Sequence, residues 1–206
     1  MNKPKIIMLC LVLLFVSSCS FSDNAKPNNL DSSLLSYHNF LLGVQVAYTL
    51  SEEEIAFDGS LFTGNYGISR FALFDINDDG IPELHLMGSF VTGYLIFTMK
   101  NDKVTLIYEG TSYESVVNSG AILYKRDGAN DIKWFYREID FETMHVSSLY
   151  AEAIDETHDG TFDRYFVEGK EVSTGEWEKF ENKFLLTSDS AVEWIDYLSW
   201  KMTVIK

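Results

Sequence analysis

The sequence predicts an α+β fold, in which one N-terminal helix and two C-terminal helices pack on an antiparallel β-meander of about seven or eight strands. Three features indicate this fold. Apolar residues recur at helical spacing early in the chain, short β-like runs fill its middle, and two helix-start signals lie in its last quarter. The length of 206 residues and a hydrophobic content of 46% favour one globular domain.

Residues 1–18 are typical of a signal peptide. Lys3 and Lys5 precede an uninterrupted apolar run at 6–16, and the small pair Ser17 and Ser18 follows. A helix that rises ~1.5 Å per residue needs about twenty apolar residues to cross a hydrocarbon core of ~30 Å. The run is therefore too short for a lasting membrane span.

The tetrad Val16-Ser17-Ser18-Cys19 resembles the lipobox of bacterial lipoproteins. The resemblance implies that Cys19 is modified with acyl chains such as palmitate. It also implies that Cys19 becomes the mature N-terminus. The protein would then be anchored in the cell membrane on its extracytoplasmic side, at the outer surface or in the periplasm. Two or three acyl chains hold a protein on a bilayer stably, whereas one does not. The alternative is ordinary secretory cleavage that leaves Cys19 as a thiol.

Charge and cysteine content narrow the classes of partner. Removing 18 residues, two lysines but no acid among them, leaves 188 residues and changes the formal charge from −15 to −17. This excess argues against nucleic acid or anionic lipid as a partner, and it fits both cation binding and a solvated acidic surface. Cys10 leaves with the signal peptide, so the mature chain has no internal disulfide. We expect a monomer.

The expected elements follow in chain order. Residues 19–29 form the lipidated cysteine and a flexible polar tether, and 30–206 form the domain. Apolar residues spaced by three and four predict an amphipathic helix. They are Leu34, Tyr37, Leu41, Val44 and Tyr48.

Beyond the glycine-rich stretch 59–67, the pattern changes to strands. The candidates are 70–75, 83–87, 94–99, 104–109, 121–125, 133–139, 146–154 and 162–167. Strands this close together pair antiparallel, because parallel crossovers need a dozen or more residues.

Two S-x-x-E capping boxes, Ser173 to Glu176 and Ser190 to Glu193, predict the two C-terminal helices. Apolar residues in the second of them would cover the sheet.

The segment 75–83, DINDDGIPE, predicts a calcium loop. Asp75, Asn77, Asp79 and Glu83 place side-chain oxygens at loop positions 1, 3, 5 and 9, and Ile81 would add a backbone carbonyl. Calcium takes six to eight oxygen ligands, and Gly80 permits the sharp bend that brings alternate side chains together. The alternative is an acidic β-turn without metal, because Asp, Asn and Gly also form turns.

This segment resembles the D-x-[DN]-x-D-G-x-x-[DE] loops of EF-hand-like, dockerin and integrin-type β-blade proteins. Position 12 is Leu86 in place of the bidentate Glu of a true EF-hand, and both flanks read as strands. The resemblance therefore implies a strand-loop-strand site in which the ion stabilises a hairpin. Residues 71–84 and 167–180 also resemble segments of uncharacterised bacterial surface lipoproteins, a resemblance that implies no activity.

A second segment repeats the spacing, with Asp155, Thr157, Asp159 and Asp163 at positions 1, 3, 5 and 9. Thr157 is a weaker ligand than Asn77, and a hairpin turn is expected at this place without any metal. The segment is the weaker of the two calcium candidates.

The function stays open between two main interpretations. The four histidines show no zinc spacing, and no nucleophile elbow, P-loop or dinucleotide motif is present. These absences favour a non-enzymatic surface module that binds a protein or an envelope glycan. Acidic pairs such as Asp140 with Glu142, or Asp155 with Glu156, keep a small envelope hydrolase as the alternative. Trp134, Tyr136, Tyr150 and Tyr165 are candidates for a sugar platform or for core packing.

Overall fold

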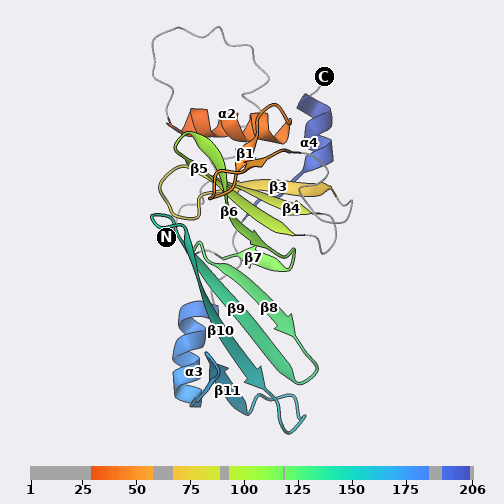
Figure 1. Cartoon of the computed structure of the whole chain (residues 1–206). Helices are drawn as coiled ribbons and strands as arrows, with labels where there is room; N and C mark the ends of the chain where they lie inside the picture. Colours follow the sequence, from red (N-terminus) through yellow and green to blue (C-terminus); the bar gives the residue numbers. More distant parts are fainter. Residues whose placement is uncertain (1–28, 58–66, 89–92, 118, 186–191, 205–206) are drawn as a thin grey trace, which may run out of the picture.

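The computed structural model describes residues 29–57, 67–88, 93–117, 119–185 and 192–204. They form two β-sheets with helices at both ends of the molecule (Figure 1). Sheet A has the order β13 (Ile195–Asp196), β3 (Ile68–Phe74), β4 (Glu83–Gly88), β5 (Tyr94–Lys100), β6 (Lys103–Gly110), β1 (Ala47–Tyr48) and β2 (Glu54–Ile55). Sheet B has the order β12 (Lys170–Val172), β11 (Arg164–Val167), β10 (His145–Ile154), β9 (Asp131–Asp140), β8 (Ile122–Asp127) and β7 (Glu114–Val116).

The α+β class and the antiparallel meander are confirmed. Strands β3 to β6 and β7 to β12 each follow one another both in the chain and across their sheet. The exception is the parallel pair β1 and β6, joined at Tyr48 and Thr105. It adds the short hairpin β1–β2 to the edge of sheet A.

The N-terminal helix, α2 (Asn29–Leu41), is shorter than its apolar stripe predicts. Gly43 follows it at φ +71°, and its amide donates to the carbonyl of Phe40 at 2.9 Å. This left-handed glycine ends the helix. The last two members of the stripe therefore leave the core helix: Val44 is 75% exposed, and Tyr48 lies in β1.

The first predicted C-terminal helix is α3 (Thr174–Phe180), which continues into the π-helix η1 (Glu181–Leu185). As its capping box predicts, the Glu176 carboxylate accepts a hydrogen bond from the Ser173 amide at 2.9 Å. The second helix, α4 (Tyr197–Val204), begins later than predicted. Asp196 caps it by accepting the Ser199 amide at 2.7 Å, whereas Ser190 lies outside the described residues.

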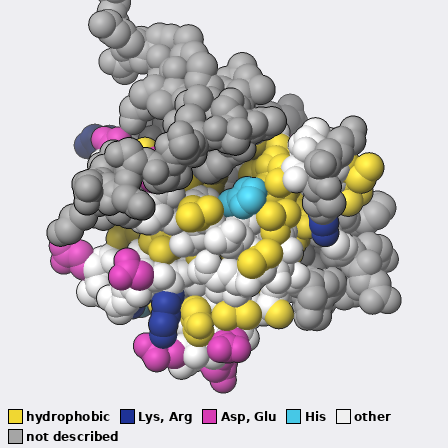
Figure 2. Space-filling view, turned by 90° about the horizontal axis from the view of Figure 1, so that it is seen from above, with side chains coloured by type: hydrophobic (Ala, Val, Ile, Leu, Met, Phe, Trp, Pro, Cys, Tyr) yellow, Lys and Arg dark blue, Asp and Glu magenta, His cyan; other side chains and the backbone are white. Residues whose placement is uncertain are grey.

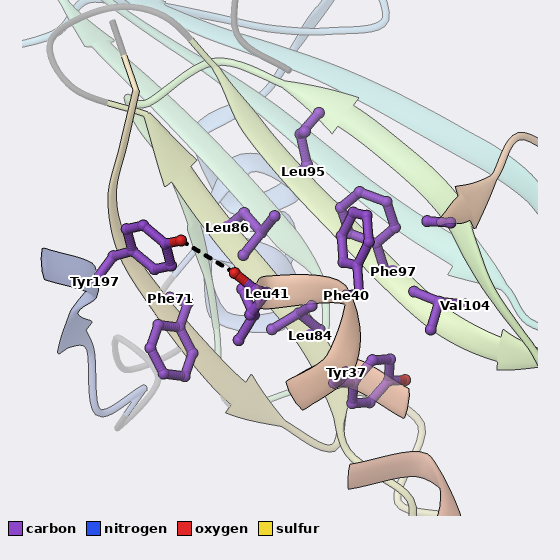
Figure 3. Packing of buried hydrophobic residues seen from close by; sticks show 11 residues of the cluster. Tyr37, Phe40, Leu41, Phe71, Leu84, Leu86, Leu95, Phe97, Val104 and Tyr197 are labelled. Atoms are coloured by element: carbon purple, nitrogen blue, oxygen red, sulfur yellow. Dashed lines mark hydrogen bonds between the residues drawn. The ribbon is translucent and has the colours of Figure 1, made fainter. Parts of the chain in front are cut away.

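The core has three main layers of contact. Helices α2 and α4 cover one face of sheet A around Phe40, Leu84 and Phe97, and the Tyr197 hydroxyl donates to the Leu41 carbonyl at 3.0 Å (Figure 3). The other face of sheet A packs against the near end of sheet B. Sheet B extends beyond this contact, and α3 covers one of its faces (Figure 1).

Candidate functional site

Two acidic loops occupy comparable places in the two sheets. The first loop, residues 75–83, joins β3 to β4, and the second loop, residues 155–163, joins β10 to β11. Both pairs of strands are antiparallel neighbours. The flanks are thus strands, as the sequence predicts, and not the helices of an EF-hand.

In the first loop, side-chain oxygens accept hydrogen bonds from backbone amides of the loop itself. The Asp75 carboxylate accepts the amides of Asp79 at 3.1 Å and Gly80 at 2.9 Å. Asp79 Oδ1 accepts the Ile81 amide at 2.7 Å, and Asp79 Oδ2 accepts the Asn77 side-chain amide at 3.0 Å. These bonds bring together the side chains at positions 1, 3 and 5.

The second loop repeats this pattern. The Asp155 carboxylate accepts the amides of Asp159 at 3.2 Å and Gly160 at 2.9 Å, and Asp159 Oδ1 accepts the Thr161 amide at 2.9 Å. The backbone matches as well: φ at position 4 is 59° in the first loop and 58° in the second, and φ at position 6 is 89° and 91°. The weaker candidate therefore has the same local structure as the stronger one.

The acid at position 9 closes each loop. Glu83 Oε2 accepts the Ile76 amide at 2.9 Å, and Asp163 Oδ2 accepts the Glu156 amide at 3.1 Å. In each loop, the carboxylate at position 9 is thereby hydrogen-bonded to the backbone amide at position 2.

Glu83 differs from Asp163 in its burial. It is 1% exposed, and its Oε1 accepts the Thr98 hydroxyl at 3.1 Å. The pKa of Glu83 is raised to about 7, chiefly by burial. Its hydrogen bonds to Ile76 and Thr98 lower the pKa in part, and the negative charges of Asp79 and Asp75 add to the rise. A cation in the first loop would offset this accumulation of negative charge.

The residues of the first loop fit calcium in part. Asp75, Asn77 and Asp79 are linked side chains with oxygen donors of the kind that calcium takes, and Ile81 lies in the same bend. Glu83 instead directs its oxygens to Ile76 and Thr98. Among the described residues, no three or more His, Cys, Asp or Glu side chains form a preassembled metal group.

The first loop also contacts the turn between β7 and β8. Gly120 has φ +83°, and a Cβ atom there would lie 2.2 Å from the Ile76 carbonyl oxygen. Only glycine permits this close approach. Beside it is a hollow of about 510 Å³, whose lining includes Asn77, Glu138 and His145.

A second hollow, of about 430 Å³, lies where β6 meets sheet B. Glu114 lines this hollow, and its side chain is only 2% exposed. The carboxylate pairs with Arg137 and accepts a hydrogen bond from the Tyr108 hydroxyl at 2.8 Å. The Thr111 amide also donates to Glu114, at 3.1 Å. The sequence does not reveal this cluster, because Glu114 and Arg137 are 23 residues apart and meet only across the sheet.

An aromatic row, defined by Tyr113, Tyr124, Phe135 and Tyr150, crosses sheet B on the same face as Glu114. Phe135 pairs in register with Tyr124 on one side and Tyr150 on the other. Successive ring centroids are 6.3, 5.5 and 5.2 Å apart. Tyr113 is 60% exposed, and the other three side chains are half-buried.

Most of the aromatics suggested by the sequence lie on the opposite face. Trp134 and Tyr165 pack on Trp177 of α3 with ring centroids 5.4 and 4.9 Å apart, and Tyr136 packs on Phe184 of η1. These three belong to the core. Of the four candidates, Tyr150 alone lies in the aromatic row.

The acidic pairs have local roles. Asp140 Oδ1 accepts the amides of Glu142 and Thr143 in the β9–β10 turn, and Glu156 pairs with Arg164. His85 is fully buried in β4, and its Nδ1 lies 2.5 Å from the Tyr94 hydroxyl. Burial lowers the pKa of His85 to about 4.

Comparison with protein-family models, with curated proteins and with solved structures finds no significant match to this chain. Residues 1–18, the predicted signal peptide, and Cys19, the predicted lipidation site, lie outside the described residues. Within the described part, no helix is long and apolar enough to cross a membrane.

Proposed function

We propose that this protein is a membrane-anchored, extracytoplasmic lipoprotein that acts as a non-enzymatic binding module for a protein or an envelope glycan. The lipobox at 16–19 supports the anchor at Cys19. The observation that carries the binding role is the aromatic row on the face of sheet B opposite α3.

The surroundings of the aromatic row favour binding. Lys133 pairs with Asp131 and Glu152 beside it, and the Tyr150 hydroxyl donates to Glu152 at 2.8 Å. Polar groups next to half-buried rings are typical of interfaces and of sugar sites, where rings supply contact area and polar groups supply orientation. The hollow at Glu114 and Arg137 extends the surface towards sheet A.

Calcium has a structural role in this proposal. An ion held by Asp75, Asn77 and Asp79, with the Ile81 carbonyl and Glu83 as further ligands, would stabilise the β3–β4 hairpin. The hairpin contacts Gly120 through Ile76, so the ion would also stabilise the junction of the two sheets. The second loop is the weaker candidate, because it ends on Asp163 and carries Thr157 at position 3.

The anchor and the binding surface are tested separately. Mass spectrometry of the processed N-terminus should find acylated Cys19, and Cys19→Ser should release the protein from the membrane fraction. A soluble Cys19→Ser protein should then bind purified envelope fractions, either isolated cell-wall glycan or detergent-solubilised membrane protein. Phe135→Ser and Tyr124→Ser should weaken that binding at least about tenfold, which corresponds to the loss of an aromatic anchor.

The matched control is Leu50→Ser, which also removes a partly exposed apolar side chain but lies outside sheet B. Equal affinity of the wild type and both aromatic variants for every fraction would contradict the binding surface. An unmodified thiol at Cys19 in the processed protein would contradict the anchor.

A further inference from the structure

Exposed apolar side chains gather at one end of the molecule. Of the seven large hydrophobic residues exposed in the described part, only Tyr113 lies beside sheet B, in the turn before β7. The other six lie on α2, on α4 or in the turns next to β1. They are Leu35, Val44, Leu50, Leu198, Met202 and Val204.

Helix α4 has apolar side chains on its outer side as well as its inner side. Tyr197 and Trp200 pack inward, with Trp200 5.2 Å from the ring of Phe71. Leu198 and Met202, one turn apart, are 66% and 67% exposed. A helix that is apolar on both sides is normally buried on both, whereas the described residues leave the outer side of α4 exposed.

Helices α2 and α4 lie next to each other at this end. The rings of His38 in α2 and Trp200 in α4 pack edge-on, with their centroids 5.7 Å apart. The Tyr197 hydroxyl is hydrogen-bonded to the carbonyl of Leu41, the last residue of α2. In the view from above, hydrophobic side chains form several patches in the middle of the described surface, whereas acidic groups lie mainly at its rim (Figure 2). Lys201 lies between the two outward apolar residues in the sequence of α4, and its ammonium group lies over the Tyr197 ring, 5.6 Å from the ring centroid.

The short distance along the chain from Cys19 to α2 points to a lipid bilayer as the partner of this apolar end. Cys19 precedes Asn29 by ten residues, which span at most about 35 Å when fully extended. If Cys19 is lipidated, as the proposed function requires, the start of α2 cannot move farther than this from the bilayer. A lipid surface is therefore always close to the apolar end, which raises its effective concentration there.

We infer that the end formed by Leu35, Leu198, Met202 and Val204 docks on the lipid bilayer. The apolar side chains enter the headgroup region, and Lys201 places its ammonium group at the polar interface. Sheet B, at the far end of the molecule, then points away from the membrane (Figure 1). The lipid anchor and this face together fix the orientation of the aromatic row towards other envelope components.

Tryptophan quenching tests the docking. The processed chain, beginning at Cys19, is coupled through the Cys19 thiol to a maleimide lipid in phosphatidylcholine vesicles that contain brominated acyl chains. Brominated chains quench tryptophans that lie close to the bilayer without touching it, and the half-buried Trp200 is the tryptophan of the docking helix α4. Because Trp200 is one of four tryptophans, we expect a loss of up to about one quarter of the emission, which Trp200→Phe removes.

The paired change Leu198→Ser with Met202→Ser should reduce the quenching at least threefold, whereas Tyr113→Ser, an exposed control in the turn before β7, should leave it unchanged. Equal quenching in vesicles with and without the paired change overturns the inference. So does a stable dimer by sedimentation that the same change dissociates, because a second copy would then cover this face. Chemical coupling makes the result independent of whether cells lipidate Cys19, so failure here is distinct from failure of the anchor.

Discussion

Asp75 and Asp155 make the same two hydrogen bonds in two different sheets. Each carboxylate accepts the amides of the fourth and fifth residues after it, at distances that agree to within 0.1 Å. The shared bend has a short carboxylate at position 1 and a glycine at position 6, residue types that form acidic turns as well as calcium loops. Hydrogen bonds alone therefore do not separate a calcium loop from an acidic turn.

Calcium should raise the melting temperature of the wild-type domain relative to the chelated protein, because an ion that binds only the folded state stabilises it. Asp75→Ala and Asp79→Ala should abolish the rise. Extracellular modules bind calcium at ~10⁻⁴ to 10⁻³ M, so calorimetry at millimolar calcium is the measurement. If calcium leaves the melting temperature of the wild-type domain unchanged, the first loop is an acidic turn without a metal.

Asp155→Ala should lower stability to a similar extent with and without calcium. The substitution removes the acceptor of the Asp159 and Gly160 amides, at a cost of about 1 to 2 kcal/mol. Chemical denaturation in calcium and in chelator measures both values. A loss that appears only in calcium would show that the second loop is also a metal site.

Glu83 and His85 should oppose each other in the pH dependence of stability. The folded pKa of Glu83 is raised to about 7, so its contribution is full below its unfolded pKa and is lost as the pH rises towards 7. The folded pKa of His85 is lowered to about 4, so its contribution is present above its unfolded pKa and is lost as the pH falls towards 4. Each amounts to about 3 kcal/mol.

Glu83→Gln removes the first contribution only. In chelator, the free energy of unfolding of this variant should rise with pH between 4.5 and 6.5, more steeply than that of the wild type. Urea denaturation at several pH values in that interval measures the slope. Parallel slopes in the two proteins would show that Glu83 ionises normally.

Gly120→Ala should destabilise the domain more than Gly169→Ala does. Both glycines have positive φ, but a Cβ atom at Gly169 meets nothing within 4 Å, whereas one at Gly120 would collide with the Ile76 carbonyl. We expect about 1 kcal/mol for backbone strain at Gly169. At Gly120 overpacking adds at least about 2 kcal/mol. Equal losses in denaturant titrations would mean that the first loop does not press on this turn.

Glu114→Ala should cost about 3 to 5 kcal/mol, because it leaves Arg137 without its carboxylate and Tyr108 without its acceptor. The control is Glu171→Ala, which breaks an exposed pair with Arg164 and should cost less than about 1 kcal/mol. Denaturant titration of both variants compares the two losses. A small loss for Glu114→Ala would show that water replaces the buried carboxylate.

The sequence by itself determined the fold class, the strand-loop-strand setting of the acidic loops and the capping of α3 at Ser173, because each follows from local spacing. It placed the N-terminal helix but not its end at Gly43, since the apolar stripe continues past the point where the backbone turns. The signal segment and Cys19 are sequence inferences as well, and they stay predictions.

Only the tertiary structure decided which side chains share a surface. It separated Tyr150 from Trp134, Tyr136 and Tyr165, joined Glu114 to Arg137, and turned Glu83 inward to Thr98. Neighbouring positions of a strand point to opposite faces, and pairing between strands sets which distant residues meet. Register and the packing of one sheet on another arise from contacts far apart in the chain, so local patterns do not contain them.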